Sequence, residues 1–383
     1  MDLQDFHLNQ QPNLIQTISG ALAYVPPPLP PKIDLSPLAM GLAAAAIAIG
    51  ELKGAARRLQ NPDMLITPLF RKEALISSAI EGTVTTLDNM LLEQILPNRS
   101  KDENAKEAFN YVRALTEANE QLKRLPLSHR VIKDAHRLLL SGLSPGRGAG
   151  KRPGEYKNSQ NAIGQIGDTE KTAKYVPPPP LQTQSCMDEL EVFINRERNG
   201  VGEALIDLAC VHYQFEAIHP FNDGNGRIGR MLVTLMAQQS GLIDQPLLHI
   251  SANIESKKAS YIELLYRVST QADWVPWIAF FLNSVEESCN DATLIVDRIL
   301  QLQTVLKQKA LAHQGNHRLA TIIDALFVKA SITATEVQKI CGTHFQTAQT
   351  DLRELESLGI VELTWPRPAI YTAKEIWNFG GRT

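Results

Sequence analysis

The sequence predicts a mostly helical protein. Apolar residues recur with helical spacing through much of residues 105–140, 183–218 and 226–308, whereas strand-like alternation is confined to a few short runs. With 383 residues, 44% of them hydrophobic, the chain can bury a core large enough for two or three domains. The domains we expect are an N-terminal helical region, a helical core and a smaller C-terminal domain, at residues 1–104, 105–308 and 309–383.

The charge and cysteine content narrow the class of protein. The chain has 38 basic and 41 acidic side chains, so its net charge gives no general attraction to nucleic acid or to an anionic membrane. The four cysteines lie far apart and lack the spacing of zinc ligands, which argues against a zinc site or a disulfide framework and fits a reducing compartment. They are Cys186, Cys210, Cys289 and Cys341.

No segment is expected to lie in a membrane. The most apolar run, residues 37–50, is too short to span a bilayer. The residues before it include Asp2 and Asp5 in place of the basic cluster of a signal peptide. The sequence therefore predicts a soluble cytoplasmic protein.

Two proline-rich segments lie in the first half of the chain. Residues 10–35 include YVPPPLPP and are expected to form an extended strap, and YVPPPP at 175–180 suggests a second one. Between the straps, Thr67 and Pro68 offer a helix start, and Gly82 offers a stop after LFRKEALISSAI.

The last seventy or so residues have a different pattern. Helices are expected near 317–329, from Thr333, and near 344–357, followed by a small two-stranded hairpin within 359–373. This order matches a winged helix-turn-helix. From Asn316 to the C-terminus seven basic and seven acidic residues balance, without the basic excess of a typical DNA reader.

One face of the predicted polar helix could still reach base edges in DNA. Partner binding and self-association as a homo-oligomer remain equally open for this domain. The side chains on that face are His344, Gln346, Gln349 and Arg353.

The densest cluster of polar and small residues is HPFNDGNGRIGR, at residues 219–230. Helical spacing of the apolar residues begins at Ile228, so the loop DGNG precedes a helix and lies at its N-terminus. Unpaired backbone N–H groups there attract an anion, and glycines let a phosphate approach closely. Arg227 and Arg230, about one turn apart, add forked donors suited to phosphate oxygens.

Two further residues of this cluster suggest chemistry on a phosphate. Asp223 would repel a phosphate unless a cation stood between them, and one carboxylate with phosphate oxygens commonly holds Mg²⁺. His219 precedes the loop and could take a proton from an attacking hydroxyl. A nucleoside polyphosphate is therefore the expected ligand, and phosphoryl or nucleotidyl transfer the expected reaction.

The motif resembles the signature of the Fic family, HxFx(D/E)GNGRxxR, at every specified position. This resemblance implies transfer of AMP from ATP to a Ser, Thr or Tyr hydroxyl of a protein, including the enzyme itself. It implies that His219 is the general base and that Asp223 holds Mg²⁺. Relatives that transfer phosphate depart from GNGR, which this chain keeps.

The resemblance also assigns the remaining motif residues. The α- and β-phosphates would be bound by Gly224, Asn225 and Gly226. The β- and γ-phosphates would be held by Arg227 and Arg230, and Phe221 would pack beneath the loop.

An earlier glutamate stands at the unfavourable end of its helix. In ISSAIEGT, Glu81 meets the negative end of the helix dipole, at a cost of about 0.3–1 kcal/mol if exposed. With Ser77 and Gly82 it matches the family's inhibitory motif, (S/T)xxxE(G/N). The resemblance implies that Glu81 pairs with Arg230 and withholds it from the γ-phosphate. Removal of AMP with the help of Glu81 is a secondary hypothesis.

Two regions around the motif are less specific. NAIGQIG, at 161–167, could be an edge strand of a β-hairpin flap that aligns a target peptide, with Ile163 facing the target, or a merely structural hairpin. Tyr261 resembles the first of two tyrosines near adenine, but Ile262 replaces the second, so stacking and plain packing both remain open.

Four other histidines lack ligand spacing and are expected to be helix or core residues. They are His129, His136, His212 and His249.

The sequence thus predicts a protein adenylyltransferase, dependent on ATP and Mg²⁺ and inhibited by its own N-terminal helix. One alternative is a regulator that binds DNA or a partner through the winged helix and uses the nucleotide site as a sensor. Another is an enzyme of the same fold that transfers phosphate or a different nucleotide.

Overall fold

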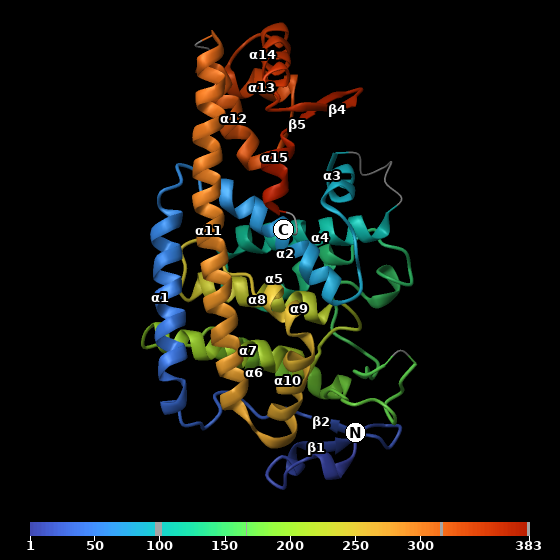
Figure 1. The fold of residues 1–383 in the computed structure, drawn as a ribbon. Coiled ribbons are helices and arrows are strands. Elements are labelled where there is room, and N and C mark those ends of the chain that lie inside the picture. The colour runs from blue at the N-terminus through green and yellow to red at the C-terminus, as the bar shows by residue number, and fades with distance from the viewer. Residues whose placement is uncertain (96–101, 166, 315–316, 381–383) are drawn as a thin grey trace. The chain divides into compact units, whose positions relative to one another are not determined.

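The computed structural model describes residues 1–95, 102–165, 167–314 and 317–380, which are mostly helical (Figure 1). The chain divides into two units by its internal contacts. Unit 1 comprises Met1–Gly50 and Glu73–Cys289, and unit 2 comprises Glu51–Lys72 and Asn290–Thr383.

Three long helices contribute residues to both units. They are α1 (Ala39–Ala56), α2 (Asp63–Ile80) and α11 (Trp274–Gln314). The other helices and strands of unit 1 are β1 (Leu14–Gln16), β2 (Leu22–Tyr24), α3 (Leu87–Ile95), α4 (Glu103–Leu122), α5 (His129–Leu139), α6 (Pro180–Ile194), α7 (Val201–Ile218), α8 (Asn225–Gln239), α9 (Ser251–Ser256) and α10 (Lys258–Gln271). Short 3₁₀ turns lie at Leu3–Asp5, Gln11–Asn13, Ser36–Leu38, Ala149–Lys151 and Asn378–Gly380.

Helix α7 forms the centre of unit 1. It is buried on nearly all sides and packs against α6 and α8. Its apolar residues recur without a polar face, as expected for a core helix. Helix α8 packs in turn against α4 and α5, so the motif at its start lies deep in the helical core.

Unit 2 ends in a three-stranded antiparallel sheet. The elements are α12 (His317–Lys329), β3 (Ser331–Thr333), α13 (Ala334–Cys341), α14 (Phe345–Ser357), β4 (Glu362–Pro366), β5 (Ala369–Thr372) and α15 (Lys374–Trp377). The strand order is β3-β5-β4, with Ile332 opposite Tyr371. The three helices and the hairpin were predicted. Strand β3 was not, because three residues directly before a capped helix carry too little alternation to be recognised.

The N-terminal strap contains structure that the sequence analysis did not predict. Strands β1 and β2 pair antiparallel around Gly20, which has a positive φ of 81°. Beyond β2, residues 25–35 form no helix or strand. At the end of β2, the N–H of Tyr24 donates to the carbonyl of Val176 at 2.9 Å. The two proline straps therefore meet.

Helix α2 begins earlier than predicted, and Pro68 lies inside it. The start is set by Asn61, whose side chain accepts a hydrogen bond from the N–H of Asp63 at 3.0 Å, and by Pro62 at the first turn. Asn61-Pro62 is thus a helix start signal that precedes the predicted start at Thr67-Pro68 by a few residues. Pro68 therefore removes one intrahelical donor and crowds the preceding turn, a cost that the tertiary packing of α2 must offset.

The apolar segment near residues 37–50 is longer than the sequence analysis assumed. It runs from Ser36 to Ala56, 21 residues, which by length and composition alone is enough to cross a membrane. Core helices of soluble proteins meet the same criterion, but only 33% of this segment is buried. Ala45 and Leu52 are fully buried, whereas Met40 and Ile47 are exposed.

Candidate active site

A cavity of about 660 Å³ lies in unit 1 at the start of α8. Its lining includes several residues predicted for the site, namely Glu81, Ile163, His219, Gly226, Arg230 and Tyr261. This volume is within the range of small-molecule sites. The predicted residues Asp223, Gly224, Asn225 and Arg227 are outside the lining of the cavity.

His219 lines the cavity from the C-terminal end of α7. Its φ of +48° is the left-handed conformation, which is strained for a residue with a side chain. Its Nδ1 lies 3.3 Å from the carbonyl oxygen of Glu216, which only accepts, so Nδ1 carries the proton and Nε2 has the free lone pair. Burial, followed by the charge of Lys157, lowers the pKa of His219 to about 4. The ring is therefore neutral at pH 7.

The loop after His219 is tied to itself by Asn225. Its side chain accepts from the N–H of Phe221 and donates to the carbonyl of Phe221, both at 2.8 Å. Because this side chain is bonded to the loop, we expect the backbone N–H of Asn225 to be its donor for an anion. Gly224 has a positive φ of 76° at the N-cap of α8, and its N–H donates to Asp223 Oδ1 at 2.6 Å.

His136 on α5 contacts this loop through Asp223 and Phe221. The N–H of Gly154 donates to its Nδ1 at 2.9 Å, so Nε2 carries the proton and donates to the carbonyl of Asp223 at 3.0 Å. The ring stacks on Phe221 at 3.8 Å between centroids. Burial lowers the pKa of His136 to about 4. His136 is a core residue, as predicted, but its contact with the motif was missed.

Arg230 on α8 is held by the end of α2. Its Nη2 donates to Glu81 Oε1 and to the carbonyl of Ser77, and its Nε donates to Ser77 Oγ, all at 2.8 Å. Burial is the largest single influence and would lower the pKa of Arg230, but the charge and hydrogen bond of Glu81 together with Tyr261 and Glu216 outweigh it, so the pKa is raised. Burial would likewise raise the pKa of Glu81, but Arg230 brings it below the ordinary value. Both side chains are therefore charged at neutral pH.

Glu81 also covers the N-terminus of α8. A methyl group built on Gly226 would lie 2.2 Å from Glu81 Oε1 and 2.9 Å from Arg230 Nη1. The carboxylate thus occupies space directly over the predicted phosphate site. Lys258 donates to the carbonyl of Ile80 at 2.5 Å, which places a cation at the negative end of α2.

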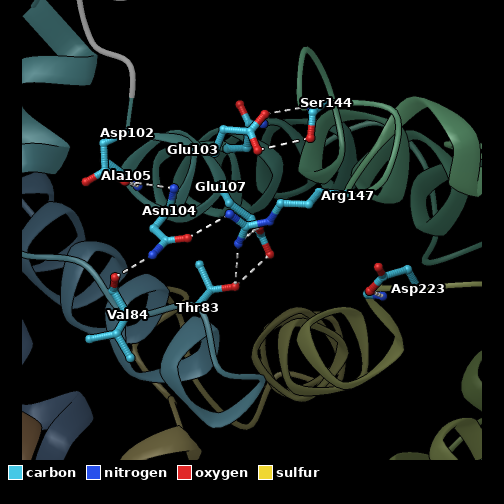
Figure 2. Close-up of polar contacts among 12 residues, drawn as sticks. Thr83, Val84, Asp102, Glu103, Asn104, Ala105, Glu107, Ser144, Arg147 and Asp223 are labelled. Atoms are coloured by element: carbon cyan, nitrogen blue, oxygen red, sulfur yellow. Dashed lines mark hydrogen bonds and ion pairs between the residues drawn. The ribbon is translucent and has the colours of Figure 1, made fainter. Parts of the chain in front are cut away.

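Glu107 on α4 is the centre of a buried polar network that the sequence analysis missed (Figure 2). Arg227 Nη1 donates to its Oε1, and Arg147 Nη2 lies 2.9 Å from its Oε2. Arg227 also reaches Asp223 Oδ1 at 3.3 Å. Arg227 is thus directed to the carboxylates of Glu107 and Asp223, and it does not line the cavity.

The same network holds the segment after α2. Thr83 donates to Glu107 Oε1 at 3.1 Å and accepts from Arg147 at 3.2 Å (Figure 2). Arg147 also donates to Asn104 Oδ1 at 2.7 Å, and Asn104 donates to the carbonyl of Val84 at 2.8 Å. These contacts fix the chain directly after Glu81 and Gly82.

Tyr261 on α10 is a core residue that also lines the cavity. Only 6% of its surface is exposed, and its hydroxyl lies 2.9 Å from His212 Nε2. Its ring is tilted against Trp277. The geometry therefore favours packing over stacking on a base.

The predicted flap is less regular than a β-hairpin. Ile163 and Tyr175 form a single antiparallel bridge, with N–H to carbonyl distances of 2.8 and 3.0 Å. Glycines and a turn between them interrupt the ladder, and residue 166 lies outside the described residues. Ile163 lines the cavity, and its target-facing role stays a prediction.

The residues of the site fit Mg²⁺ only together with a phosphorylated ligand. Among the residues that the structure describes, no group of three or more His, Cys, Asp or Glu side chains could hold a metal. Asp223 is the one acidic side chain of the motif, and 37% of it is exposed. Mg²⁺ commonly takes one carboxylate and completes its octahedron with phosphate oxygens and water.

The site therefore combines an anion-binding helix N-terminus, a buried arginine and a neutral imidazole around one cavity. Comparisons with known proteins agree with this description. The profile described as "Fic/DOC family N-terminal" matches residues 40–120, and the profile described as "Fic/DOC family" matches residues 126–237. The chain belongs to the Fic/DOC family.

Curated relatives include Protein adenylyltransferase Fic from several Drosophila species. The Drosophila melanogaster protein is 26% identical over 249 residues, 64% of this chain and 45% of the relative. The Drosophila persimilis protein is 27% identical over 217 residues, 55% of this chain and 38% of the relative. The chain thus spans less than half the length of these relatives.

Solved structures with the same fold include a Fic family protein from Desulfovibrio desulfuricans. It is 22% identical, with a TM-score of 0.57, over 90% of this chain and 98% of that one. A Fic domain containing signaling protein from Bacteroides thetaiotaomicron is 20% identical, with a TM-score of 0.50, over 66% of this chain and 97% of that one.

Proposed function

We propose that this protein is an adenylyltransferase that transfers AMP from ATP to a Ser, Thr or Tyr hydroxyl of a protein, in an Mg²⁺-dependent reaction. The observation that carries the proposal is the neutral His219 beside the N-terminus of α8 in one cavity. The adenylyltransferase activity named for the Drosophila relatives supports it.

The proposed reaction uses the chain's own groups as follows. The target hydroxyl oxygen attacks the α-phosphorus, and Nε2 of His219 takes its proton. The bond from the α-phosphorus to the bridging oxygen breaks, and pyrophosphate leaves. Backbone N–H groups of Asn225 and Gly226 face the anion, and Mg²⁺ beside Asp223 would screen its charge.

We propose further that Glu81 inhibits the reaction. Its carboxylate holds the buried Arg230 and covers Gly226, so a bound triphosphate would have to displace it. A charge-assisted hydrogen bond contributes about 1.5–3 kcal/mol, which corresponds to roughly ten- to a hundredfold in rate or affinity. Removal of AMP by the same site remains a secondary proposal.

The experiment is to incubate the purified chain with ATP and Mg²⁺ and to measure AMP addition by intact mass. We expect Glu81→Gly and Glu81→Gln to raise modification about ten- to a hundredfold over wild type, and Glu81→Gly/His219→Ala to abolish it. Glu117→Gln, an exposed glutamate on α4, is the matched control and should leave the rate unchanged.

Other results would redirect the proposal. Addition of phosphate or of another nucleotide would retain the fold and change the group transferred. If folded Glu81→Gly binds ATP yet modifies neither itself nor any protein in a lysate, the transferase proposal fails.

We also infer that unit 2 contains a winged helix-turn-helix. Supporting this are the element order from α12 to β5 and the strand order β3-β5-β4. Such a fold often reads DNA through its second helix of the turn, here α14. Gln346 and Arg353 on α14 are exposed, as is His344 at its N-cap. A duplex DNA titration at increasing salt tests this role. Binding that weakens steeply with salt supports it, and absence of binding at low salt excludes it.

A further inference from the structure

The carbonyl groups of residues 218–221 accept hydrogen bonds from Lys157 and Asn161, just before and at the start of the predicted flap strand. Lys157 Nζ donates to the carbonyl of Ile218 at 3.1 Å, and the N–H of Lys157 donates to that of Pro220 at 2.8 Å. Asn161 Nδ2 donates to the carbonyls of His219 and Phe221, both at 3.0 Å. Four successive carbonyls thus accept from two residues of another segment.

These hydrogen bonds stabilise the strained left-handed conformation of His219. A non-glycine residue in the left-handed conformation persists only where the surrounding structure over-determines it. Lys157 Nζ also donates to Asn161 Oδ1 at 2.8 Å, so the two side chains hold each other in position. Lys157 is only 4% exposed, which shows that the contact is part of the core and not a surface pairing.

We propose that Lys157 and Asn161 are positioning residues for His219: they hold its loop in the left-handed conformation, and the ammonium group of Lys157 favours the neutral imidazole. The proposal rests on the proposed transfer reaction for its catalytic meaning. The geometry and the charge of the pair can be tested without that reaction.

The charges near His219 determine whether loss of Lys157 raises or lowers the pKa of His219. The charged side chains that line its cavity are Glu81, Asp168, Lys174, Glu216, Arg230 and Lys258, and the titratable tyrosines there are Tyr175, Tyr213, Tyr261 and Tyr266. Lys157 lies outside this lining, but its charge also acts on His219. Lys157 lowers the pKa of His219, whereas Glu81 raises it. Burial lowers the pKa of Lys157 to about 7, so Lys157 is charged throughout the acidic range in which His219 would gain a proton.

The first test measures the pKa of His219 by NMR of the histidine rings in the full chain, with His219→Gln to assign the signal. We expect Lys157→Met to raise this pKa from about 4 toward the ordinary value of about 6.5, and Lys157→Arg to keep it low. Lys309→Met, an exposed lysine on α11, is the control for loss of one positive charge and should not move it.

The second test measures kcat and KM for AMP transfer in the Glu81→Gly background. We expect Asn161→Ala to lower kcat about tenfold or more with little change in the KM for ATP. In Lys157→Met the loss relative to Glu81→Gly alone should be greater at pH 5.5 than at pH 8, because a larger fraction of His219 is then protonated. Asn161→Ala keeps the proposal testable if Lys157→Met does not fold.

The outcomes separate this proposal from the proposed function. An unchanged pKa of His219 in folded Lys157→Met, or unchanged kcat in Asn161→Ala, overturns the positioning role even if AMP transfer occurs. If no AMP transfer occurs in Glu81→Gly but the pKa rises in Lys157→Met, the proposed function fails and the placement of His219 by Lys157 stands.

Discussion

Glu107→Ala is expected to destabilise the protein by about 3–5 kcal/mol, because it leaves the buried guanidinium of Arg227 without its main counter-charge. The side chains of Glu107 and Arg227 are 5% and 4% exposed, so water cannot replace the lost partner. Asp223 remains near Arg227 at 3.3 Å, but it is half-exposed and its Oδ1 also accepts from Gly224. The free energy of unfolding, measured with urea, checks this expectation.

Glu103 provides a matched control on the same helix. It lies about one turn earlier on α4 and accepts hydrogen bonds from the N–H and hydroxyl of Ser144 at 2.8 and 3.0 Å (Figure 2). Glu103→Ala breaks no pair of buried charges and should cost only about 1–2 kcal/mol. If Glu107→Ala lowers the free energy of unfolding by no more than Glu103→Ala does, the pairing of Glu107 with Arg227 does not stabilise the fold as we expect. A double variant with Arg227→Met should cost less than the sum of the two single changes.

The network around Glu107 also contacts the segment that follows Glu81, the residue for which we propose an inhibitory role. The network holds Thr83 and Val84 directly after Glu81, and it holds Arg227 away from the cavity. The same carboxylate therefore restrains both the segment after Glu81, for which we propose an inhibitory role, and an arginine that the Fic resemblance assigns to phosphate binding.

Local patterns in the sequence account for much of this site. The motif could be interpreted from its spacing because loop, helix start and arginines are contiguous in the chain. Glu81 could be recognised because a carboxylate at the C-terminal end of a helix is locally unfavourable and needs a partner elsewhere. The helices of unit 2 were predicted because each has a cap or a clear apolar face.

The supporting residues could not be predicted in the same way, since they reach the motif only through tertiary contacts. Lys157 lies 62 residues before His219 in an irregular segment without periodicity. Glu107 did carry a signal, because it shares the buried face of α4 with Tyr111 and Ala114. A carboxylate on an apolar face predicts a buried cationic partner, but the sequence cannot say that the partner is Arg227.

His136→Gln is expected to destabilise the protein at pH 8 by about 1–3 kcal/mol, since it disturbs the hydrogen bond to Asp223 and the stacking on Phe221. The size of this effect should depend on pH in a defined direction. The pKa of His136 is about 4 in the folded chain and about 6.5 when unfolded. Below pH 6.5 the unfolded wild type therefore binds a proton that the folded wild type does not.

The stability contributed by a neutral His136 is thus present above pH 6.5 and is lost as the pH falls toward 4, by about 1.4 kcal/mol per pH unit. The Gln variant has no such titration, so its deficit should shrink by about 3 kcal/mol over this window and vanish or reverse near pH 4. Urea unfolding of both proteins at several pH values measures the difference, in which the contributions of all other groups cancel. His344→Gln, a change of an exposed histidine at the N-cap of α14, is the control.

The loss of stability in His136→Gln relative to wild type could instead stay constant from pH 8 to pH 4. That result would mean that His136 gains a proton in the folded chain over this range as readily as in the unfolded chain. In that case the N–H of Gly154 could not donate to Nδ1, and the placement of Asp223 through this ring would have to be abandoned.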